Sequence, residues 1–212
     1  IGPKRYDAPW KDIEAQGYIA PADCTEVRVA MPSADRMAYA MADAADRPRL
    51  GAAHGAKIAV VEKIAARHPG EPMLVIGQFI DQLEEISERL GADLITGKTP
   101  VKRRQQLFDA FRAGEIDRLV VSKVANFSID LPEASVAVQV SGAFGSRQEE
   151  AQRLGRLLRP KADGRTAHFY TVVMRDTQDQ DYAAHRQRFL AEQGYAYTIL
   201  DADELGAAAE AD

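Results

Sequence analysis

Hydrophobic and polar positions follow two alternating patterns along this chain. Short apolar runs, typical of strands buried on both faces, are separated by longer segments in which apolar residues recur with a helical period. The strands predicted in this way span 24–32, 73–77, 93–96, 118–122, 135–141, 166–174 and 196–200. The predicted helices span 33–47, 55–69, 81–91, 100–114, 146–159 and 181–194. The alternation predicts an α/β fold, a mostly parallel sheet with helices on both faces.

Residues with special backbone preferences sharpen the ends of several helices. Ser33 precedes an apolar helical pattern and is predicted to be its N-cap. Pro100 at the start of one helix and Gly114 just past its end follow the usual asymmetry of helix termini. Gly91 is predicted to close the preceding helix.

In open parallel sheets, ligands bind where the strands end at their carboxyl termini. The loops to inspect for a site therefore follow Gly77, Thr96, Ser122 and Ser141. One of them contains Gly97-Lys98-Thr99, which looks like the end of a phosphate-binding loop. Such a loop requires a glycine five residues before Gly97, and that position is Ala92, so the triplet does not complete the motif.

Composition narrows the classes of function. The 212 residues carry a net charge of −5, so any nucleic-acid contact must use a local basic patch. The single cysteine, Cys24, excludes an internal disulfide and, with four scattered histidines, a Cys/His zinc cluster; this fits a reducing cytoplasm. No apolar run is long enough to span a membrane. We expect a linker at 1–22, one domain at 23–203 and a flexible tail at 204–212.

A helical segment at 152–160 carries the clearest candidate chemistry. Gln152, Arg156 and Arg159 share one helix face, and three leucines fall on the opposite face. The planar, permanently charged guanidinium suits phosphate oxygens, and two of them can stabilise charge during phosphoryl transfer. The alternative is a solvated face whose arginines pair with Glu149 and Glu150.

A second candidate stretch spans 119–141. Ser122 and Lys123 stand at the carboxyl end of a predicted strand, where they could contact a phosphodiester backbone, and Asp130 could accept a hydrogen bond from a ribose hydroxyl. The alternative assigns Ser122-Lys123 to a strand end and Asp130 to a turn.

Taken together and in order, "LVIGQF", "ITGKTPVKRRQQLFDAFRAGEIDRLVVSKVANFSIDLPEA" and "SRQEEAQRLGRLLRP" resemble motifs IV, IVa, V and VI of the second RecA-like domain of superfamily 2 helicases. Within that superfamily, "SIDLPEA", "GSRQEEAQRLGRLLRPK" and "IGPKRYDAPWKDIE" resemble the bacterial XPB type, the xeroderma pigmentosum group B DNA repair helicases. The resemblance implies a RecA-like three-layer fold, the second motor domain of an ATP-dependent 3′-to-5′ DNA helicase or translocase, and a cytoplasmic, nucleoid-associated location.

The resemblance also implies roles for individual residues. Arg156 and Arg159 match arginine fingers that reach the ATP γ-phosphate, and Gln152 matches a glutamine that positions the attacking water or that phosphate. Asp130 matches an aspartate near the ribose. Gly97, Lys98, Ser122 and Lys123 match positions that contact the DNA backbone, and Gly97 would allow close approach. The alternative for Lys98 is a solvated loop lysine. Arg104 aligns with an arginine that is structural rather than catalytic.

Neither a complete phosphate-binding loop nor a magnesium-binding acidic tetrad occurs in the sequence. The resemblance places both in an N-terminal RecA-like domain of the same protein, which would bind most of the ATP and Mg²⁺, so this chain alone should not hydrolyse ATP. The expected partners are that domain, DNA bound without sequence preference, and a nuclease. The alternative is a RecA-like interaction module that docks a partner nuclease or repair protein and binds no nucleotide.

Overall fold

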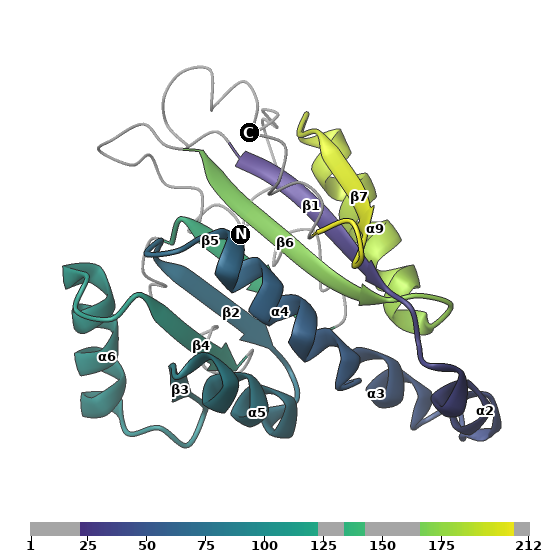
Figure 1. Ribbon diagram of the computed structural model, residues 1–212. Helices are drawn as coiled ribbons and strands as arrows, with labels where there is room; N and C mark the ends of the chain where they lie inside the picture. Colours follow the sequence, from purple (N-terminus) through teal and green to yellow (C-terminus); the bar gives the residue numbers. More distant parts are fainter. Residues whose placement is uncertain (1–21, 123–133, 143–165, 206–212) are drawn as a thin grey trace, which may run out of the picture.

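A seven-stranded parallel sheet forms the centre of the structure. The computed structural model describes residues 22–122, 134–142 and 166–205. Within these ranges the strands lie in the order β3-β4-β2-β5-β6-β1-β7, and every neighbouring pair is parallel (Figure 1). The strands are β1 (Ala22–Val29), β2 (Met73–Gly77), β3 (Asp93–Ile95), β4 (Arg118–Ser122), β5 (Val136–Gln139), β6 (Ala167–Met174) and β7 (Tyr197–Asp201). The predicted parallel sheet is confirmed.

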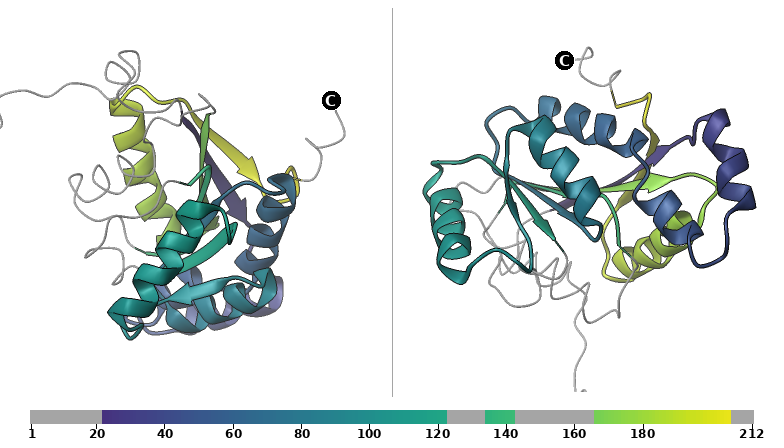
Figure 2. Two further views of the ribbon diagram at one scale, coloured as in Figure 1. Left: turned by 90° about the vertical axis from the view of Figure 1, so that its left-hand side faces the viewer. Right: turned by 90° about the horizontal axis from the view of Figure 1, so that it is seen from below.

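Helices cover the two faces of the sheet and give it three layers. The helices of the described ranges are α2 (Ser33–Met41), α3 (Arg47–Ala52), α4 (Ala56–Arg67), α5 (Ile80–Leu90), α6 (Val101–Ala113) and α9 (Gln178–Glu192). On one face, Ile64 of α4 and Ile86 of α5 are buried in a core with Val138. On the other, Phe108 of α6 and Phe189 of α9 share a core with Leu74. Figure 2 (right) shows α4 and α5 on one side of the sheet and α9 on the other.

The burial of the strands explains why they could be predicted from apolar runs in the sequence. All five residues of β2 are buried, and the central strands β4 and β5 are almost as fully enclosed. Strands covered on both faces cannot alternate polar with apolar residues, so they appear in sequence as short apolar blocks. The edge strand β7 is more exposed and has a weaker pattern.

The helix predicted at 33–47 is wrong in its extent, because α2 ends at Met41 and α3 begins separately at Arg47. α2 buries none of its residues, so no core contact holds it together beyond its own length. The Arg47 guanidinium donates to the carbonyl oxygens of Ala40 and Ala42 at the end of α2, which stabilises the break.

The N-cap predicted at Ser33 is also wrong. Pro32 occupies that position, since its carbonyl oxygen accepts the first backbone hydrogen bonds of the helix, from Asp35 and Arg36. Ser33 is therefore the first helical residue, and no side chain caps this end. The glycine ends are confirmed: Gly91 and Gly114 terminate α5 and α6 in the left-handed conformation, at φ 60° and 72°.

Candidate functional site

Four neighbouring strands bring the predicted loops to one edge of the sheet. Ile95 of β3 pairs with Val121 of β4, Ser122 of β4 pairs with Gly77 of β2, and Ile76 pairs with Gln139 of β5. Because these strands are parallel and in register, their carboxyl ends stand side by side. One edge of the sheet therefore carries the turn after β3 together with Ser122, Gln78 and Ser141, as the sequence predicts.

The turn that contains Gly97-Lys98-Thr99 is closed by two threonines. The Thr96 amide donates to the Thr99 hydroxyl (2.9 Å), and the Thr99 amide donates back to the Thr96 carbonyl (3.1 Å). The Thr96 hydroxyl in turn accepts from the Lys98 amide (3.2 Å). The backbone amides of Lys98 and Thr99 are thus used within the turn and are not directed at a phosphate, which supports the rejection of a phosphate-binding loop.

Arg104 fastens this turn to α6. Its guanidinium donates to the carbonyl oxygens of Thr99 (3.2 Å) and Thr96 (3.4 Å), so one side chain joins the two ends of the turn. This contact agrees with the structural role expected for Arg104. The sequence analysis missed this closed turn, which the Thr96-x-x-Thr99 spacing could have indicated, since threonine side chains often bond to nearby backbone groups.

Lys98 is the cation that the turn presents to solvent. Its side chain is exposed, and no ion pair to it is found within the described part of the chain. Gly97 is exposed beside it. Its φ lies outside the left-handed region, unlike the φ of Gly91 and Gly114. The turn geometry therefore does not demand a glycine at 97.

Ser122 lies next to this turn but is buried, with only 1% of its surface exposed. It therefore stands at the predicted edge without presenting its side chain to solvent in this structure. Its predicted companion Lys123 lies outside the described residues, as do Asp130, Gln152, Arg156 and Arg159. The structure brings Gly97, Lys98 and Ser122 to one edge, and the other predicted contacts stay predictions.

The carboxyl end of β5 is tightly packed against the end of β2. The Gln78 amide donates to the Ser141 hydroxyl (2.9 Å). A Cβ atom at Gly77 would lie 2.9 Å from that hydroxyl and 3.0 Å from a methyl group of Val140, so only glycine fits there. Sequence reasoning treated Gly77 and Ser141 only as strand ends and missed this contact.

A buried ion pair lies beneath the same edge. Lys57 of α4 is fully buried and contacts the carboxylate of Asp179 in the first turn of α9. Burial lowers the pKa of the Lys57 ammonium, and the neighbouring Asp179 carboxylate opposes that shift. A lysine in an amphipathic helix gave no sequence signal for burial, because lysine is almost always exposed.

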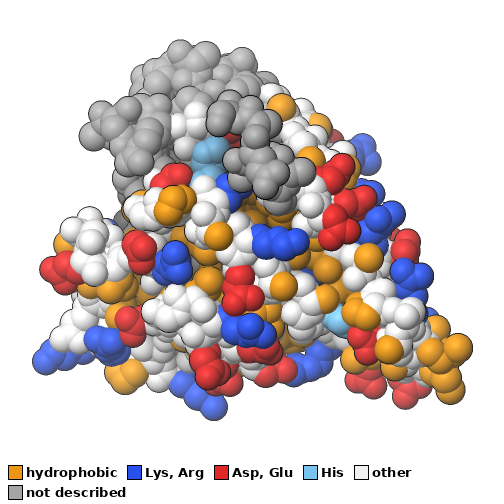
Figure 3. All heavy atoms as spheres, viewed as in Figure 1, with side chains coloured by type: hydrophobic (Ala, Val, Ile, Leu, Met, Phe, Trp, Pro, Cys, Tyr) orange, Lys and Arg blue, Asp and Glu red, His pale blue; other side chains and the backbone are white. Residues whose placement is uncertain are grey.

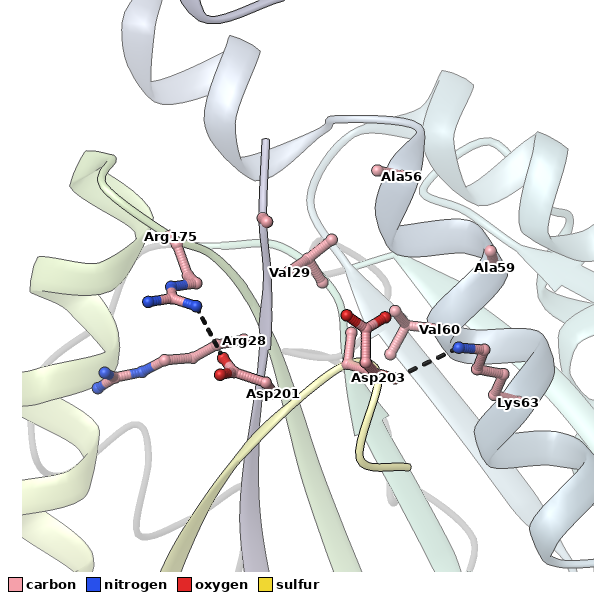
Figure 4. Close-up of a pocket in the computed structure, with 11 residues that line it drawn as sticks. Arg28, Val29, Ala56, Ala59, Val60, Lys63, Arg175, Asp201 and Asp203 are labelled. Atoms are coloured by element: carbon pink, nitrogen blue, oxygen red, sulfur yellow. Dashed lines mark hydrogen bonds and ion pairs between the residues drawn. The ribbon is translucent and has the colours of Figure 1, made fainter. Parts of the chain in front are cut away.

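On the β7 side of the sheet, a hollow of about 260 Å³ lies beside the carboxyl ends of β1 and β7 (Figure 4). Two of its basic side chains already have acceptors: Arg175 pairs with Asp201 (3.1 Å), and the Lys63 ammonium donates to the Ala202 carbonyl (3.3 Å). Figure 4 shows Arg28 directed away from the hollow, and its guanidinium pairs with Glu26 (2.7 Å). We therefore assign no ligand to this hollow.

The surface over α4 and α5 carries both signs of charge. Figure 3 shows basic and acidic side chains interspersed on this face, without a broad basic area. Among the described residues, no group of three or more His, Cys, Asp or Glu side chains could hold a metal ion. No helix in the described ranges is long and apolar enough to cross a membrane.

Comparison with known proteins identifies relatives for nearly the whole chain. The family model described as ERCC3/RAD25/XPB C-terminal helicase matches residues 13–210. The chain is 72% identical over 205 residues to the DNA 3'-5' helicase XPB of Kineococcus radiotolerans, and 67% identical to that of Mycobacterium tuberculosis. Each match covers 97% of this chain and 37% of the relative, so the chain spans little more than a third of these curated relatives.

Solved structures with the same fold are more distant in sequence. The C-terminal domain of the DEAD-box protein Dbp5 superposes with a TM-score of 0.64 at 15% identity, covering 87% of this chain and 92% of that domain. At this identity the likeness concerns the fold alone. It agrees with the RecA-like three-layer architecture described above.

Proposed function

Because this chain belongs to the ERCC3/RAD25/XPB C-terminal helicase family, we propose that it is the C-terminal motor domain of an ATP-dependent 3′-to-5′ DNA helicase or translocase. The observation that carries the proposal is the match to the family over residues 13–210, together with 72% identity to a bacterial helicase of this type. The parallel sheet, whose carboxyl edge carries the turn with the exposed Lys98, supports it.

In this proposal ATP binds between two RecA-like domains. Arg156 and Arg159 supply permanent positive charge to the γ-phosphate, where negative charge is redistributed as the bond to the β-phosphate breaks. Gln152 orients the attacking water or that phosphate, and Asp130 binds the ribose. The other domain supplies the phosphate cradle and the groups that bind Mg²⁺, so we assign no metal ligand to this chain.

The DNA contacts in this proposal lie along the carboxyl edge. Lys98 offers an exposed ammonium to a phosphate, and Gly97 leaves the backbone open beside it. At the next strand Lys123 continues the contact, after Ser122, whose side chain is buried. Such contacts bind the phosphodiester backbone and carry no sequence information. Closure and opening of the two domains, driven by ATP, would then move the DNA along this edge.

The arginine assignment is tested in the full-length helicase that contains this chain. We expect Arg156→Ala and Arg159→Ala each to lower kcat for ATP by about 10³-fold, the smaller end of the range for an arginine finger, while DNA binding persists. Arg188→Ala is the matched control, since Arg188 is exposed and pairs with Glu192 one helical turn away (3.2 Å). ATP hydrolysis at the wild-type rate in both test variants would show that these residues are not arginine fingers.

A further inference from the structure

Helix α2 stands at the carboxyl edge of the sheet and buries none of its residues. It follows β1 after a short turn, and Figures 1 and 2 show it beyond the tips of β1 and β6. Tyr39 is its one half-buried residue, and the Tyr39 hydroxyl accepts from the Gln178 amide at the start of α9 (3.3 Å). Asp35 pairs with His54 (3.3 Å). Within the described ranges, α2 is thus attached mainly by polar contacts.

One side of α2 is apolar and faces solvent. Ala34, Met37, Ala38 and Met41 follow each other at intervals of one helical turn or less and share that side, here called the methionine stripe. Met37 is 67% exposed and Met41 is 79% exposed, and both alanines are exposed as well. Figure 3 shows hydrophobic side chains gathered at the lower right, over α2. A continuous apolar stripe, unlike single exposed residues, indicates a contact surface.

α2 has little in this domain to keep it helical. It has nine residues and no side chain that caps its first turn. Isolated helices shorter than about 12 residues are only marginally stable in water, and most helices in proteins depend on the packing of an apolar face. The apolar face of α2 is the methionine stripe, so a partner that covers the stripe would stabilise the helix.

A second hollow, of about 450 Å³, adjoins the stripe, because Ala40 in its lining lies between Met37 and Met41 along α2. Apolar residues and arginines line it together: Met31, Tyr39, Ala40, Arg36, Arg47 and Arg175. Asp176 is the one carboxylate in this lining, so positive charge predominates. The hollow therefore suits an apolar side chain that lies next to a carboxylate.

A nucleic acid does not match this surface. The side chains of the methionine stripe have no donor for a phosphate oxygen. Asp35, Asp43 and Asp46 are exposed along α2 and the turn that follows it, where they would repel successive phosphates. A protein segment with apolar residues and a single carboxylate fits both the stripe and the hollow.

The size of the stripe narrows the kind of protein. α2 is about 14 Å long, whereas a stable contact between separate proteins buries about 800 Å² on each side. A small contact is sufficient when both surfaces belong to one chain, because linkage gives a high effective concentration. The curated relatives contain such further chain, since the match covers only 37% of their length.

We propose that the methionine stripe and its adjoining hollow dock the N-terminal part of the same protein, through an apolar segment that carries a carboxylate. The inference rests on the proposed function, which places a second RecA-like domain opposite this carboxyl edge. The strand order supports it, because β1, which leads into α2, is separated from β3 by four strands. Docking at α2 thus leaves the turn with Lys98, which follows β3, accessible to DNA.

Cross-linking in the full-length protein that contains this chain identifies the partner of α2. A photoreactive benzoylphenylalanine replaces Met41, and cross-linked peptides are identified by mass spectrometry, with DNA present and with and without a non-hydrolysable ATP analogue. We expect cross-links within one molecule to peptides of the N-terminal part. The same replacement at Ile199, an exposed apolar position on β7, is the control and should give at least tenfold less of this product. Cross-links only to DNA or only to a second copy, or none in either condition, would overturn the proposal.

Hydrogen exchange of the α2 amides tests whether the contact stabilises the helix. Met37→Ala/Met41→Ala shortens the stripe but raises intrinsic helix propensity, so faster exchange can only come from a lost contact. We expect the α2 amides of the full-length double variant to exchange about tenfold faster than in the wild type. Val101→Ala is the matched control, because Val101 of α6 is 79% exposed, as Met41 is. Equal or slower exchange in the double variant would show that nothing docks on the stripe.

ATP hydrolysis by the same full-length protein keeps this inference apart from the proposed function. If the protein hydrolyses ATP but Met41 gives no cross-link to the N-terminal part, only the docking surface is wrong. If Met41 gives that cross-link but the protein does not hydrolyse ATP in the presence of DNA, the contact stands and the helicase function is wrong.

Discussion

At the residue scale, the two basic residues at the turn after β3, Arg104 and Lys98, make different kinds of contact. Arg104 directs its guanidinium inward, to the carbonyl oxygens of Thr96 and Thr99. Lys98 points its ammonium outward, where it is exposed. A planar fork suits the bridging of two fixed acceptors, whereas a mobile point charge suits a phosphate whose position varies as DNA moves. The functional contact is therefore expected at Lys98.

Replacement of Lys98 tests this contact directly. In the full-length helicase, Lys98→Ala should weaken DNA binding and reduce the slope of log K against log salt concentration by about 0.7 to 0.9, the value for one phosphate contact. Arg112→Ala is the control, because Arg112 lies at the other end of α6 and pairs with Asp109 (3.0 Å). An unchanged salt slope in Lys98→Ala would remove Lys98 from the DNA contact.

At the scale of elements, the edge strand β7 is tied to β1 by a buried carboxylate. Glu26 of β1 has only 1% of its surface exposed and accepts from the Arg28 guanidinium and from the Tyr197 hydroxyl of β7 (3.0 Å). Burial raises the pKa of the Tyr197 phenol, and the nearby Glu26 carboxylate raises it further. The phenol must stay protonated for β7 to keep this contact.

Because of this raised pKa, we expect the fold to lose stability at alkaline pH. The folded pKa of Tyr197 is raised above its unfolded value of about 10. The contribution of the protonated phenol to the free energy of unfolding is therefore fully present below pH 10 and is lost as the pH rises further. Between pH 10 and 11.5, the wild type should lose up to about 1.4 kcal/mol of unfolding free energy per pH unit more than Tyr197→Phe does. Urea titrations of both proteins measure this difference, and parallel curves would contradict the raised pKa.

At the scale of the whole molecule, the question is whether this domain binds DNA or only a partner protein. Its sheet is covered by apolar cores on both faces, so the chain can be studied by itself. We expect the isolated chain to bind labelled single-stranded DNA weakly and with strong salt dependence, since backbone contacts release counterions. Separate titrations with DNA and with a candidate nuclease check this. Tight nuclease binding without salt-sensitive DNA binding would favour an interaction module instead.

The sequence by itself determined the architecture and pointed to the family. Strands enclosed on both faces must be apolar throughout, so 73–77 and 118–122 were predicted with their observed bounds. Gly91 and Gly114 marked helix ends because only a left-handed residue closes those turns easily. Sequence was less informative where burial is absent: α2 has no buried residue, and its extent and cap were predicted wrongly.

Only the tertiary structure decided which distant residues meet. Lys57 lies 83 residues from Val140 and 122 residues from Asp179, and no local pattern records such a contact. Gly77 was visible as a strand end, but its need to be glycine comes from the side chains of Leu83, Ser141 and Val140, which the fold packs around it. The periodicity of apolar residues indicates which face of each segment is buried in the core. Which segments pair with one another depends on long-range packing, and this packing forms the carboxyl edge on which the proposed function depends.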